Sequence, residues 1–238
     1  MSRVPDGWRK YTIGDVVSEI DAGTSVNSQD KACSDGEKGV LKTSCVSLGY
    51  FCPDEHKVVV EDEVARLRVP VQGDRIILSR MNTPELVGAN GYVPSDIPNV
   101  FLPDRLWQIN SDRSVCSTKW LAQYLASPVG RGALSACATG TSGSMKNISK
   151  AKFKEIRLLL PPLPEQTKIA AILSSVDEAI AATQSVIDQT RKVKQGLLQD
   201  LLTRGIGHTR FKQTEIGEIP EAWEVKRLDS VVKLKIIC

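Results

Sequence analysis

The 238-residue chain contains few of the side chains that form metal sites or acid–base pairs. It has only two histidines, His56 and His208, and its six cysteines are scattered without a C-x-x-C pair. Because a zinc site needs closely paired thiolate or imidazole ligands, this spacing favours free, reduced thiols over metal ligands or disulfides. The composition therefore predicts neither a bound metal nor a catalytic histidine pair.

Long apolar runs are missing as well. The first ten residues are polar and charged, unlike a secretory signal peptide, and no apolar stretch approaches the roughly 20 residues that a membrane-spanning helix needs. A formal net charge of +3 and a pI near 8.5 make the chain mildly basic, which is compatible with nucleic-acid binding but not diagnostic of it. We therefore expect a soluble, cytoplasmic protein without a membrane partner.

The motifs of nucleotide-dependent enzymes are also absent. There is no G-x-x-x-x-G-K-[ST] loop for ATP, no glycine-rich dinucleotide fingerprint, and no Asn-Pro-Pro-Tyr-like sequence of an amino-methyltransferase. The run Pro-Asp-Glu-His-Lys at 53–57 superficially resembles a nuclease carboxylate–lysine cluster, but consecutive polar residues after a proline are typical of a solvated turn. The sequence favours a binding protein, and a stand-alone nuclease is the enzymatic alternative.

Residues 1–160 are predicted to form a mixed α/β globular domain. Short apolar runs bounded by glycine, proline and aspartate are typical of strands. The predicted strands are 57–60, 75–78, 106–109 and 157–160. Two short helices are also expected, one that Ser117 caps and that stops before Pro128, and one over 148–156 that Ser149 caps.

The segment 160–166, Leu-Pro-Pro-Leu-Pro-Glu-Gln, leads directly into a long helical pattern. Its prolines discourage helix before Pro164, which suits a helix start, and Glu165 places a carboxylate near the positive end of the helix dipole. From there to Thr203 no proline occurs, and the only glycine is Gly196. At about 1.5 Å per residue, the predicted helix is about 58 Å long.

Apolar residues recur along this helix at alternating steps of four and three, with Thr183, Thr190 and Lys194 at the remaining positions of the pattern. A stripe of this length with a 3.5-residue period predicts a coiled-coil seam. An amphipathic helix that lies on its own domain is the alternative, and helix-length statistics alone favour it. The residues expected in a dimer interface are Ile169, Leu173, Val176, Ile180, Ile187, Leu197 and Leu201.

Two segments are candidates for DNA contact. Residues 140–157 carry five basic side chains and one glutamate, a net charge of +4, and open with small residues whose backbone can approach phosphates closely. Asn147 can pair bidentately with adenine, and Arg80, after a predicted strand, can read guanine. An ordinary solvated loop and a strand-ending turn are the alternatives. The predicted DNA-binding residues are Ser79, Arg80, Asn82, Thr83, Gly140, Ser142, Ser144, Lys146, Asn147, Lys150 and Lys152.

The junction at 160–173 carries a family resemblance. Leu-Pro-Pro-Leu-Pro-Glu-Gln followed by Thr-Lys-Ile-Ala-Ala-Ile-Leu resembles the proline-to-coil junction of type I restriction-modification specificity subunits. Individually weaker pieces precede it in family order. These are Val-Pro-Asp-Gly-Trp at 4–8, Gly-Asp-Arg-Ile-Ile-Leu at 73–78, Leu-Ala-Gln-Tyr-Leu-Ala-Ser at 121–127 and Ala-Thr-Gly-Thr-Ser-Gly at 138–143.

The resemblance implies an α+β protein: a DNA target-recognition domain over 1–160 and a coiled-coil spacer helix over 161–204. It also implies a subunit that binds double-stranded DNA and does not catalyse. Methyltransferase subunits would bring S-adenosylmethionine, and the restriction motor subunit would bring ATP and Mg²⁺, so no cofactor is expected on this chain. The alternative is a coiled-coil scaffold whose domain binds another protein. Salt-dependent binding to duplex DNA would distinguish the DNA-recognition subunit from this scaffold.

The tail, residues 205–238, repeats the start of the chain. Val-Pro-Asp-Gly-Trp at 4–8 returns as Ile-Pro-Glu-Ala-Trp at 219–223, and the valine pair at 16–17 returns at 231–232 with the same offset. An offset nearly as long as the chain indicates that a second unit begins in the tail. Since specificity subunits usually carry two such units, the chain resembles half of one. We therefore expect an antiparallel homodimer.

Overall fold

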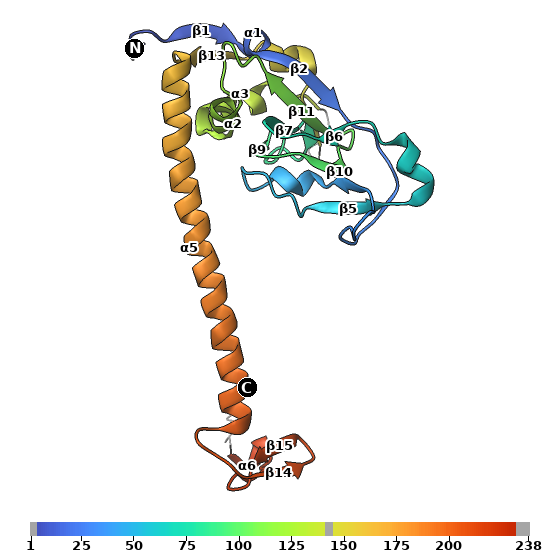
Figure 1. The fold of residues 1–238 in the computed structure, drawn as a ribbon, viewed down its shortest axis with the longest axis vertical. Coiled ribbons are helices and arrows are strands. Elements are labelled where there is room, and N and C mark those ends of the chain that lie inside the picture. The colour runs from blue at the N-terminus through green and yellow to red at the C-terminus, as the bar shows by residue number, and fades with distance from the viewer. Residues whose placement is uncertain (1–3, 141–144, 232–238) are drawn as a thin grey trace, which may run out of the picture. The chain divides into compact units, whose positions relative to one another are not determined.

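The computed structural model describes residues 4–140 and 145–231, whose elements are labelled in Figure 1. The chain divides into two compact units, Met1–Ser174 and Ser175–Cys238. The boundary lies inside the 42-residue helix α5 (Leu163–Arg204), which begins in the first unit and ends in the second. A mixed α/β domain followed by a long helix confirms the predicted fold class.

Two β-sheets form the centre of the first unit. The first sheet contains β2 (Val17–Ala22), β11 (Leu106–Ser111), β7 (Arg75–Ser79) and β9 (Asn90–Val93), in that spatial order. The second contains β3 (Ser28–Gln29), β5 (His56–Val59), β4 (Gly39–Leu41), β10 (Ile97–Phe101) and β6 (Pro70–Val71). All neighbours are antiparallel except β4 and β10. Strands β5, β7 and β11 confirm three predicted apolar runs.

Strand β7 shows how the first sheet is covered on both faces. Successive side chains of a strand point to opposite faces, and those of Ile76 and Leu78 join one buried cluster while Ile77 joins another. The first cluster includes Trp107 and residues of the helices, and the second lies between the two sheets. Because both faces are buried, β7 is a continuous apolar run instead of an alternating one.

Four helices precede α5 in the first unit: α1 (Ile13–Val16), α2 (Thr118–Ala126), α3 (Pro128–Cys137) and α4 (Lys150–Lys154). Ser117 Oγ accepts from the backbone N–H of Trp120 and Ser149 Oγ from that of Lys152, so both predicted caps are confirmed. Two short 3-10 helices, η1 (Thr43–Val46) and η2 (Glu61–Arg66), lie in connections. No helix of the described ranges is both long and apolar enough to cross a membrane.

Helix α3 was not predicted. Pro128 is predicted only to end the preceding helix, whereas in the structure it also occupies the first turn of α3. Ser127 caps this helix, because its Oγ accepts from the N–H of Gly130 at 3.2 Å. A serine followed by proline is a usual helix start, so the signal was present in the sequence.

The first turns of α5 belong to the domain that precedes them. The buried amide of Gln166 accepts from Ser117 N at 2.8 Å and donates to the carbonyls of Val115 and Pro161 at 3.0 and 2.9 Å. Gln123 Nε2 donates to the carbonyl of Ala170 at 3.3 Å. These contacts explain why the first unit reaches Ser174, whereas the sequence analysis ended the domain at residue 160.

Two strands frame this domain at its chain ends. β1 (Arg9–Thr12) pairs antiparallel with β13 (Arg157–Leu160), with Arg9 opposite Leu160. The strand predicted at 157–160 is therefore confirmed. Since β13 immediately precedes α5, the β1–β13 pair ties the start of the domain to the start of the long helix.

The second unit contains a hairpin of β14 (Phe211–Thr214) and β15 (Gly217–Pro220), and the short α6 (Leu228–Val231). The repeat seen in sequence has a local structural counterpart. Trp8 N donates to Pro5 O at 3.2 Å, and Trp223 N donates to Pro220 O at 2.9 Å. Ile13 begins α1, and Leu228, its counterpart, begins α6.

Candidate nucleic-acid interface

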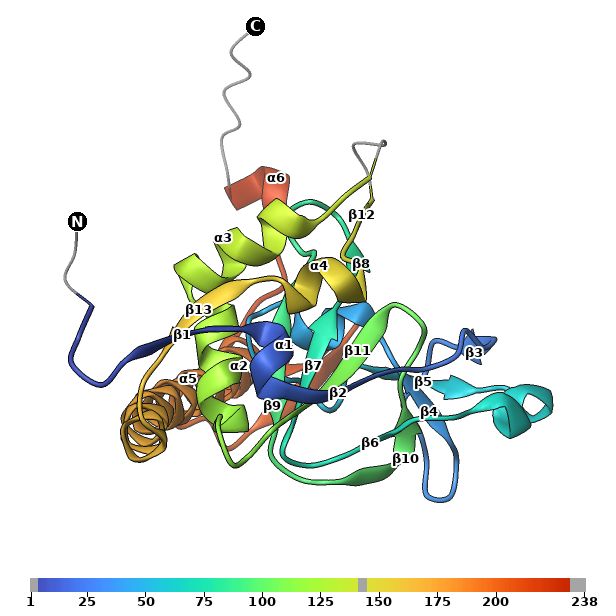
Figure 2. The same cartoon turned by 90° about the horizontal axis from the view of Figure 1, so that it is seen from above.

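The two segments predicted to contact DNA lie side by side in the structure (Figure 2). β8 (Met81–Asn82) follows β7 and pairs antiparallel with β12 (Lys146–Asn147), so that Asn82 lies opposite Lys146. Asn147 also exchanges two backbone hydrogen bonds with Thr139, at 2.9 and 2.8 Å. We call Thr139, Arg80, β8 and β12 the ribbon. Its surface is a continuous edge built from both candidate segments.

Arg80 is held in the ribbon from two directions. Its Nε donates to the carbonyl of Asp104 at 2.7 Å, and its Nη1 donates to Oδ1 of Asn147 at 3.2 Å. Its backbone carbonyl accepts from the N–H of Ile148 at 2.8 Å. A guanidinium carries five N–H donors, so these two side-chain bonds leave donors that can bind a phosphate or a base.

Ser79, the first residue of the candidate segment 79–83, is fully buried. A side chain without exposed surface cannot touch DNA, so the direct contact predicted for Ser79 does not fit this structure. Its Oγ instead accepts from Nδ2 of Asn82 at 3.1 Å, and Oδ1 of Asn82 accepts from the N–H of Thr83 at 2.9 Å. Ser79 therefore orients Asn82, which is half-buried at the surface, as is Thr83.

The predicted lysines differ in what they contact. Lys146 Nζ donates to the carbonyl of Gly140 at 2.9 Å, and Lys152 pairs with Glu155 at 3.4 Å. Exposed ion pairs of this kind contribute little to stability, so Lys152 can exchange its partner for a phosphate. Lys150 Nζ donates to the carbonyl of Ile20. Lys150 is thus tied to the domain surface by a bond that the sequence did not indicate.

Gly140 ends the described part of the loop before β12. A Cβ atom at this position would lie 2.5 Å from the carbonyl oxygen of Met145, which explains why glycine is needed. Ser142 and Ser144, which were also predicted to bind DNA, lie outside the described residues. The close backbone approach at Gly140 brings both ends of this loop to the ribbon.

Arg131 of α3 holds the turn that follows the 79–83 segment. The sequence does not predict this contact, because it does not predict helix α3. Arg131 Nη1 and Nη2 donate to the carbonyls of Val87 and Glu85 at 2.9 and 2.8 Å. Both carbonyls belong to the turn that follows Thr83, so the guanidinium holds this turn in place. Burial lowers the pKa of Arg131, although an arginine remains charged at neutral pH.

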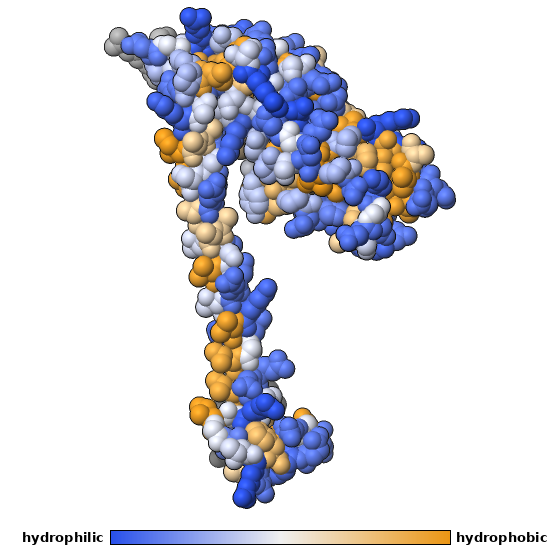
Figure 3. Space-filling view, viewed as in Figure 1, coloured by the Kyte–Doolittle hydropathy of each residue, from blue (hydrophilic) through white to orange (hydrophobic). Residues whose placement is uncertain are grey.

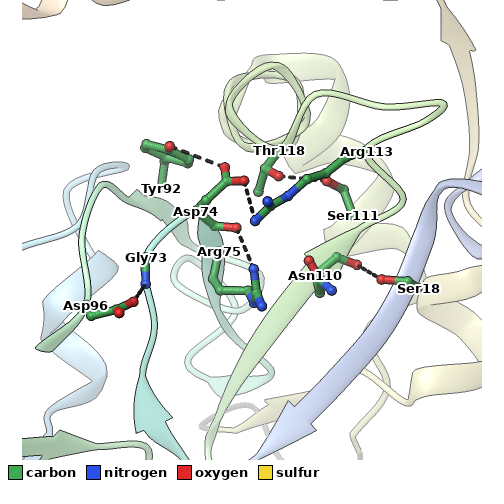
Figure 4. A network of polar contacts seen from close by, with 10 residues as sticks. All are labelled: Ser18, Gly73, Asp74, Arg75, Tyr92, Asp96, Asn110, Ser111, Arg113 and Thr118. Atoms are coloured by element: carbon green, nitrogen blue, oxygen red, sulfur yellow. Dashed lines mark hydrogen bonds and ion pairs between the residues drawn. The ribbon is translucent and has the colours of Figure 1, made fainter. Parts of the chain in front are cut away.

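A second polar cluster lies at the opposite end of β7 (Figure 4). The carboxylate of Asp74 pairs with Arg113 at 2.7 Å and accepts from the hydroxyl of Tyr92 at 3.3 Å, while Arg75 donates to the Asp74 carbonyl. Burial, followed by the adjacent Asp74 carboxylate, raises the pKa of Tyr92. These contacts join the ends of β7, β9 and β11, which indicates a structural role.

The cysteines do not form a chemical site in the part of the chain that the structure describes. The five described cysteines are free. Burial raises the pKa of Cys116 to about 12 and also raises the pKa of Cys45. Such thiols stay protonated at neutral pH and are poor nucleophiles. Within 4–140 and 145–231, no three His, Cys, Asp or Glu residues are grouped to hold a metal ion.

The apolar stripe of α5 remains largely exposed (Figure 3). Ile169 is half-buried and packs against the core of the first unit. The other predicted interface residues, with 40% to 62% of their surface exposed, are Leu173, Val176, Ile180, Ile187, Leu197 and Leu201. The face buried on the domain, Gln166, Ala170 and Ser174, lies about 60–140° around the helix from Ile169. The packing of α5 on its own domain is thus limited to its first turns.

Comparison with protein families identifies a match over most of the chain. The model for the type I restriction modification DNA specificity domain matches residues 5–190. This range includes the ribbon, both sheets and the first part of α5.

Individual relatives agree with this match. Over its full length the chain is 27% identical to the putative type I restriction enzyme MjaX specificity subunit of Methanocaldococcus jannaschii, of which it covers 55%. A 90-residue segment, 37% of the chain, is 43% identical to the MjaVIII specificity subunit of the same organism and covers 21% of it. The chain spans about half the length of the first of these relatives, and less of the second.

A solved structure shows the same fold. The crystal structure of a type I restriction-modification system S subunit from M. genitalium superimposes with a TM-score of 0.57 at 20% sequence identity. The match covers 84% of this chain and 47% of that one.

Proposed function

Because the chain belongs to the family of type I restriction-modification DNA specificity domains, we propose that its first unit recognises a specific sequence in double-stranded DNA. The ribbon carries this proposal. It joins Arg80, Asn82, Lys146 and Asn147, from two segments far apart in sequence, on one edge of the domain. The remaining members of the proposed interface are Thr83, Gly140, Lys150 and Lys152.

The side chains divide by chemistry into readers and anchors. Arginine pairs bidentately with guanine and asparagine with adenine, so Arg80 and Asn147 are the proposed base readers. Lysine ammonium groups neutralise phosphates and release counterions, which suits Lys146 and Lys152 to positioning the duplex. Asn82 and Thr83 have hydrogen-bonding groups suited to either contact.

A second copy of the chain is the proposed partner of α5. A seam of this length needs a facing helix, and the described residues contain no other helix of comparable length. When the α5 helices of two copies pair antiparallel with Ser185 at the centre, every seam position of one copy faces a seam position of the other. The facing pairs are Ile169 with Leu201, Leu173 with Leu197, Val176 with Lys194, Ile180 with Thr190, and Thr183 with Ile187. Each polar position thus meets an aliphatic side chain, which supports this register.

The chain works, in this proposal, inside a cytoplasmic type I restriction-modification complex. A methyltransferase subunit and a restriction motor subunit dock on it and carry S-adenosylmethionine, ATP and Mg²⁺. This chain supplies recognition and spacing and has no catalytic role. The fold that the chain shares with a type I S subunit supports this role.

The proposal is tested by expressing the chain together with its methyltransferase subunit and mapping the methylated sites in the host DNA. Recognition by this chain predicts methylation at one defined sequence that disappears when the chain is omitted. The purified chain should also bind duplex DNA with an affinity that falls as salt rises. Salt-independent binding, with no methylated sequence that depends on the chain, would favour the protein-binding scaffold instead.

A further inference from the structure

The first unit has an apolar groove that the proposed DNA contact does not use. It has a volume of about 740 Å³ and lies between the β1–β13 pair and helices α2 and α3. Its lining includes Trp8, Tyr11, Trp120, Tyr124 and Val129. The rings of Trp120 and Tyr124 stack with their centroids 5.4 Å apart, and Val129 has 69% of its surface exposed. Trp120 is buried and Val129 is exposed, so the groove offers an open apolar wall on which another apolar surface can pack.

The groove adjoins the start of α5. Trp8, on its wall, donates from Nε1 to the Glu165 carboxylate at 3.2 Å, and Glu165 lies in the first turn of the helix. Lys10 and Arg157 add positive charge to the lining, and the one acidic residue there, Asp15, already accepts two hydrogen bonds from Thr12. With two basic side chains against one carboxylate, the net charge of the lining is +1.

The second unit has the complementary properties. Four of its large aliphatic side chains outside α5 are exposed: Ile206, Ile216, Val225 and Leu228. Residues 205–231 carry five acidic and four basic side chains, and four of the acidic ones, all glutamates, fall together between Gln213 and Val225 with no basic residue among them. The glutamates are Glu215, Glu218, Glu221 and Glu224.

We propose that residues 205–231 of a second copy of this chain occupy the groove. This inference rests on the antiparallel pairing of α5 in the proposed function. In the register centred on Ser185, Leu201 of one copy faces Ile169 of the other, so the tail of one copy emerges beside the Glu165 turn of the other. Apolar surface then meets apolar surface, and the glutamates meet Lys10 and Arg157.

The tail adds to β1 in this arrangement and does not replace it, although it repeats the turn that precedes β1. Gly7 has a φ of +84°, and Ala222 at the matching position has no positive φ, because alanine is strained there. Thr12 is locked to Asp15 by hydrogen bonds of 2.7 Å from both its backbone N–H and its hydroxyl. The tail has Arg227 and Ser230 at these positions and cannot form that lock. The first copy of the repeat is therefore the better partner for β13.

Cross-linking of mixed cysteine variants tests the docking. One full-length chain carries Val129→Cys and the other carries Ile216→Cys, at two positions with equal exposure. After mixing and mild oxidation, docking predicts a covalent species of twice the chain mass, well above that of either variant alone and of the wild type. Leu48→Cys, on an exposed residue of the first unit outside the groove lining, replaces Val129→Cys as the matched control. This control should give several-fold less product.

Charge reversal provides an independent measurement. Lys10→Glu with Arg157→Glu, placed in the chain that carries Val129→Cys, should lower the cross-linking yield several-fold. Adding Glu218→Lys and Glu221→Lys to the other chain should restore it. A cross-linking yield that stays the same after the first charge reversal and after the second would overturn the charge pairing on which the docking depends.

The oligomeric state separates this inference from the proposed function. A chain that sediments as a dimer but gives no cross-link above the control overturns the docking and leaves the pairing of α5 and the recognition of DNA intact. A single chain that carries both cysteines and closes into a cross-linked monomer overturns the docking as well. A wild-type chain that sediments as a monomer contradicts both the pairing and the docking, while methylation mapping still reports DNA recognition.

Discussion

Arg80 Nη1 donates a hydrogen bond to Oδ1 of Asn147 at 3.2 Å, although the two residues are 67 positions apart in the chain. The amide oxygen of Asn147 is therefore engaged before any DNA arrives. Bidentate pairing with adenine uses both the oxygen and the nitrogen of an asparagine amide. Arg80 thus restricts how Asn147 can present its amide, and in the proposed function the two side chains act as one reading unit instead of two.

Removing either member of this pair should relax sequence discrimination. We expect Arg80→Ala and Asn147→Ala each to cost about 1–3 kcal/mol of preference for the mapped target over single-base variants of it. Because the side chains touch, the double variant should lose less than the two single losses combined. Affinities for matched and mismatched duplexes measure this, with Arg68→Ala, an exposed arginine of the same unit, as control. Additive losses would show that the two residues read independently.

Lys146 of the ribbon and Lys152 of α4 should contribute to affinity without sequence preference. Replacing Lys146 and Lys152 by Ala should weaken binding to all duplexes and reduce the slope of log affinity against log salt by about 0.9 for each lost phosphate contact. Lys31→Ala with Lys42→Ala, which removes two lysines that pair with Glu37 and Asp30 away from the ribbon, is the charge-matched control. An unchanged slope in the Lys146 and Lys152 variant would place this edge away from the DNA.

Lys150 should show a mixed effect. Its ammonium donates to the carbonyl of Ile20, so Lys150→Ala should lower both DNA affinity and the free energy of unfolding. A hydrogen bond to a charged group contributes about 1.5–3 kcal/mol to stability. Urea denaturation and salt-dependent binding of the same variant separate the two effects. A free energy of unfolding equal to that of the wild type would mean that this hydrogen bond makes no net contribution to stability.

Ser79→Ala should act through Asn82. The substitution removes the acceptor of the Asn82 side chain inside the protein, which should cost about 1 kcal/mol of stability. Since Ser79 itself is buried, the salt slope of DNA binding should not change. An unchanged stability together with a reduced salt slope would support the direct contact between Ser79 and DNA that the sequence predicts.

Charges in the seam should separate the proposed dimer. Ile180→Asp with Ile187→Asp would bury unpaired carboxylates between the helices, at a cost of several kcal/mol. Sedimentation at micromolar concentration should show a dimer for the wild type and a monomer for this variant. Val186→Asp, on an equally exposed residue of α5 outside the seam, should leave the dimer intact. Dissociation by both variants would locate the interface elsewhere.

The proposed pairing also constrains the DNA target. Two identical domains related by a two-fold axis read inverted copies of one half-site, and a long helix between them leaves an unread spacer. Methylation mapping with this chain as the only specificity subunit should therefore return an interrupted palindrome. Two unrelated half-sites would mean that a different second domain completes the complex.

Several features followed from the sequence because their causes are local. Ser117 and Ser149 cap the helices that follow them by accepting from the backbone N–H three residues on. Pro164 lies in the first turn of α5, and Gly205, which has a φ of +69°, follows its last residue. The apolar stripe of α5 is likewise a matter of spacing along one helix. The family resemblance was carried by these same local motifs.

The features that make the candidate site depended on the tertiary structure. Three of these features involve segments far apart in sequence. They are the pairing of β8 with β12, the burial of Ser79 and the hydrogen bond from Lys150 to Ile20. Local propensity cannot select among distant partners, because the free energy that selects them comes from burial and hydrogen bonding in the assembled domain. The sequence by itself determined which residues have DNA-binding chemistry and where the long helix runs. Only the packed domain decided that Arg80 and Asn147 meet.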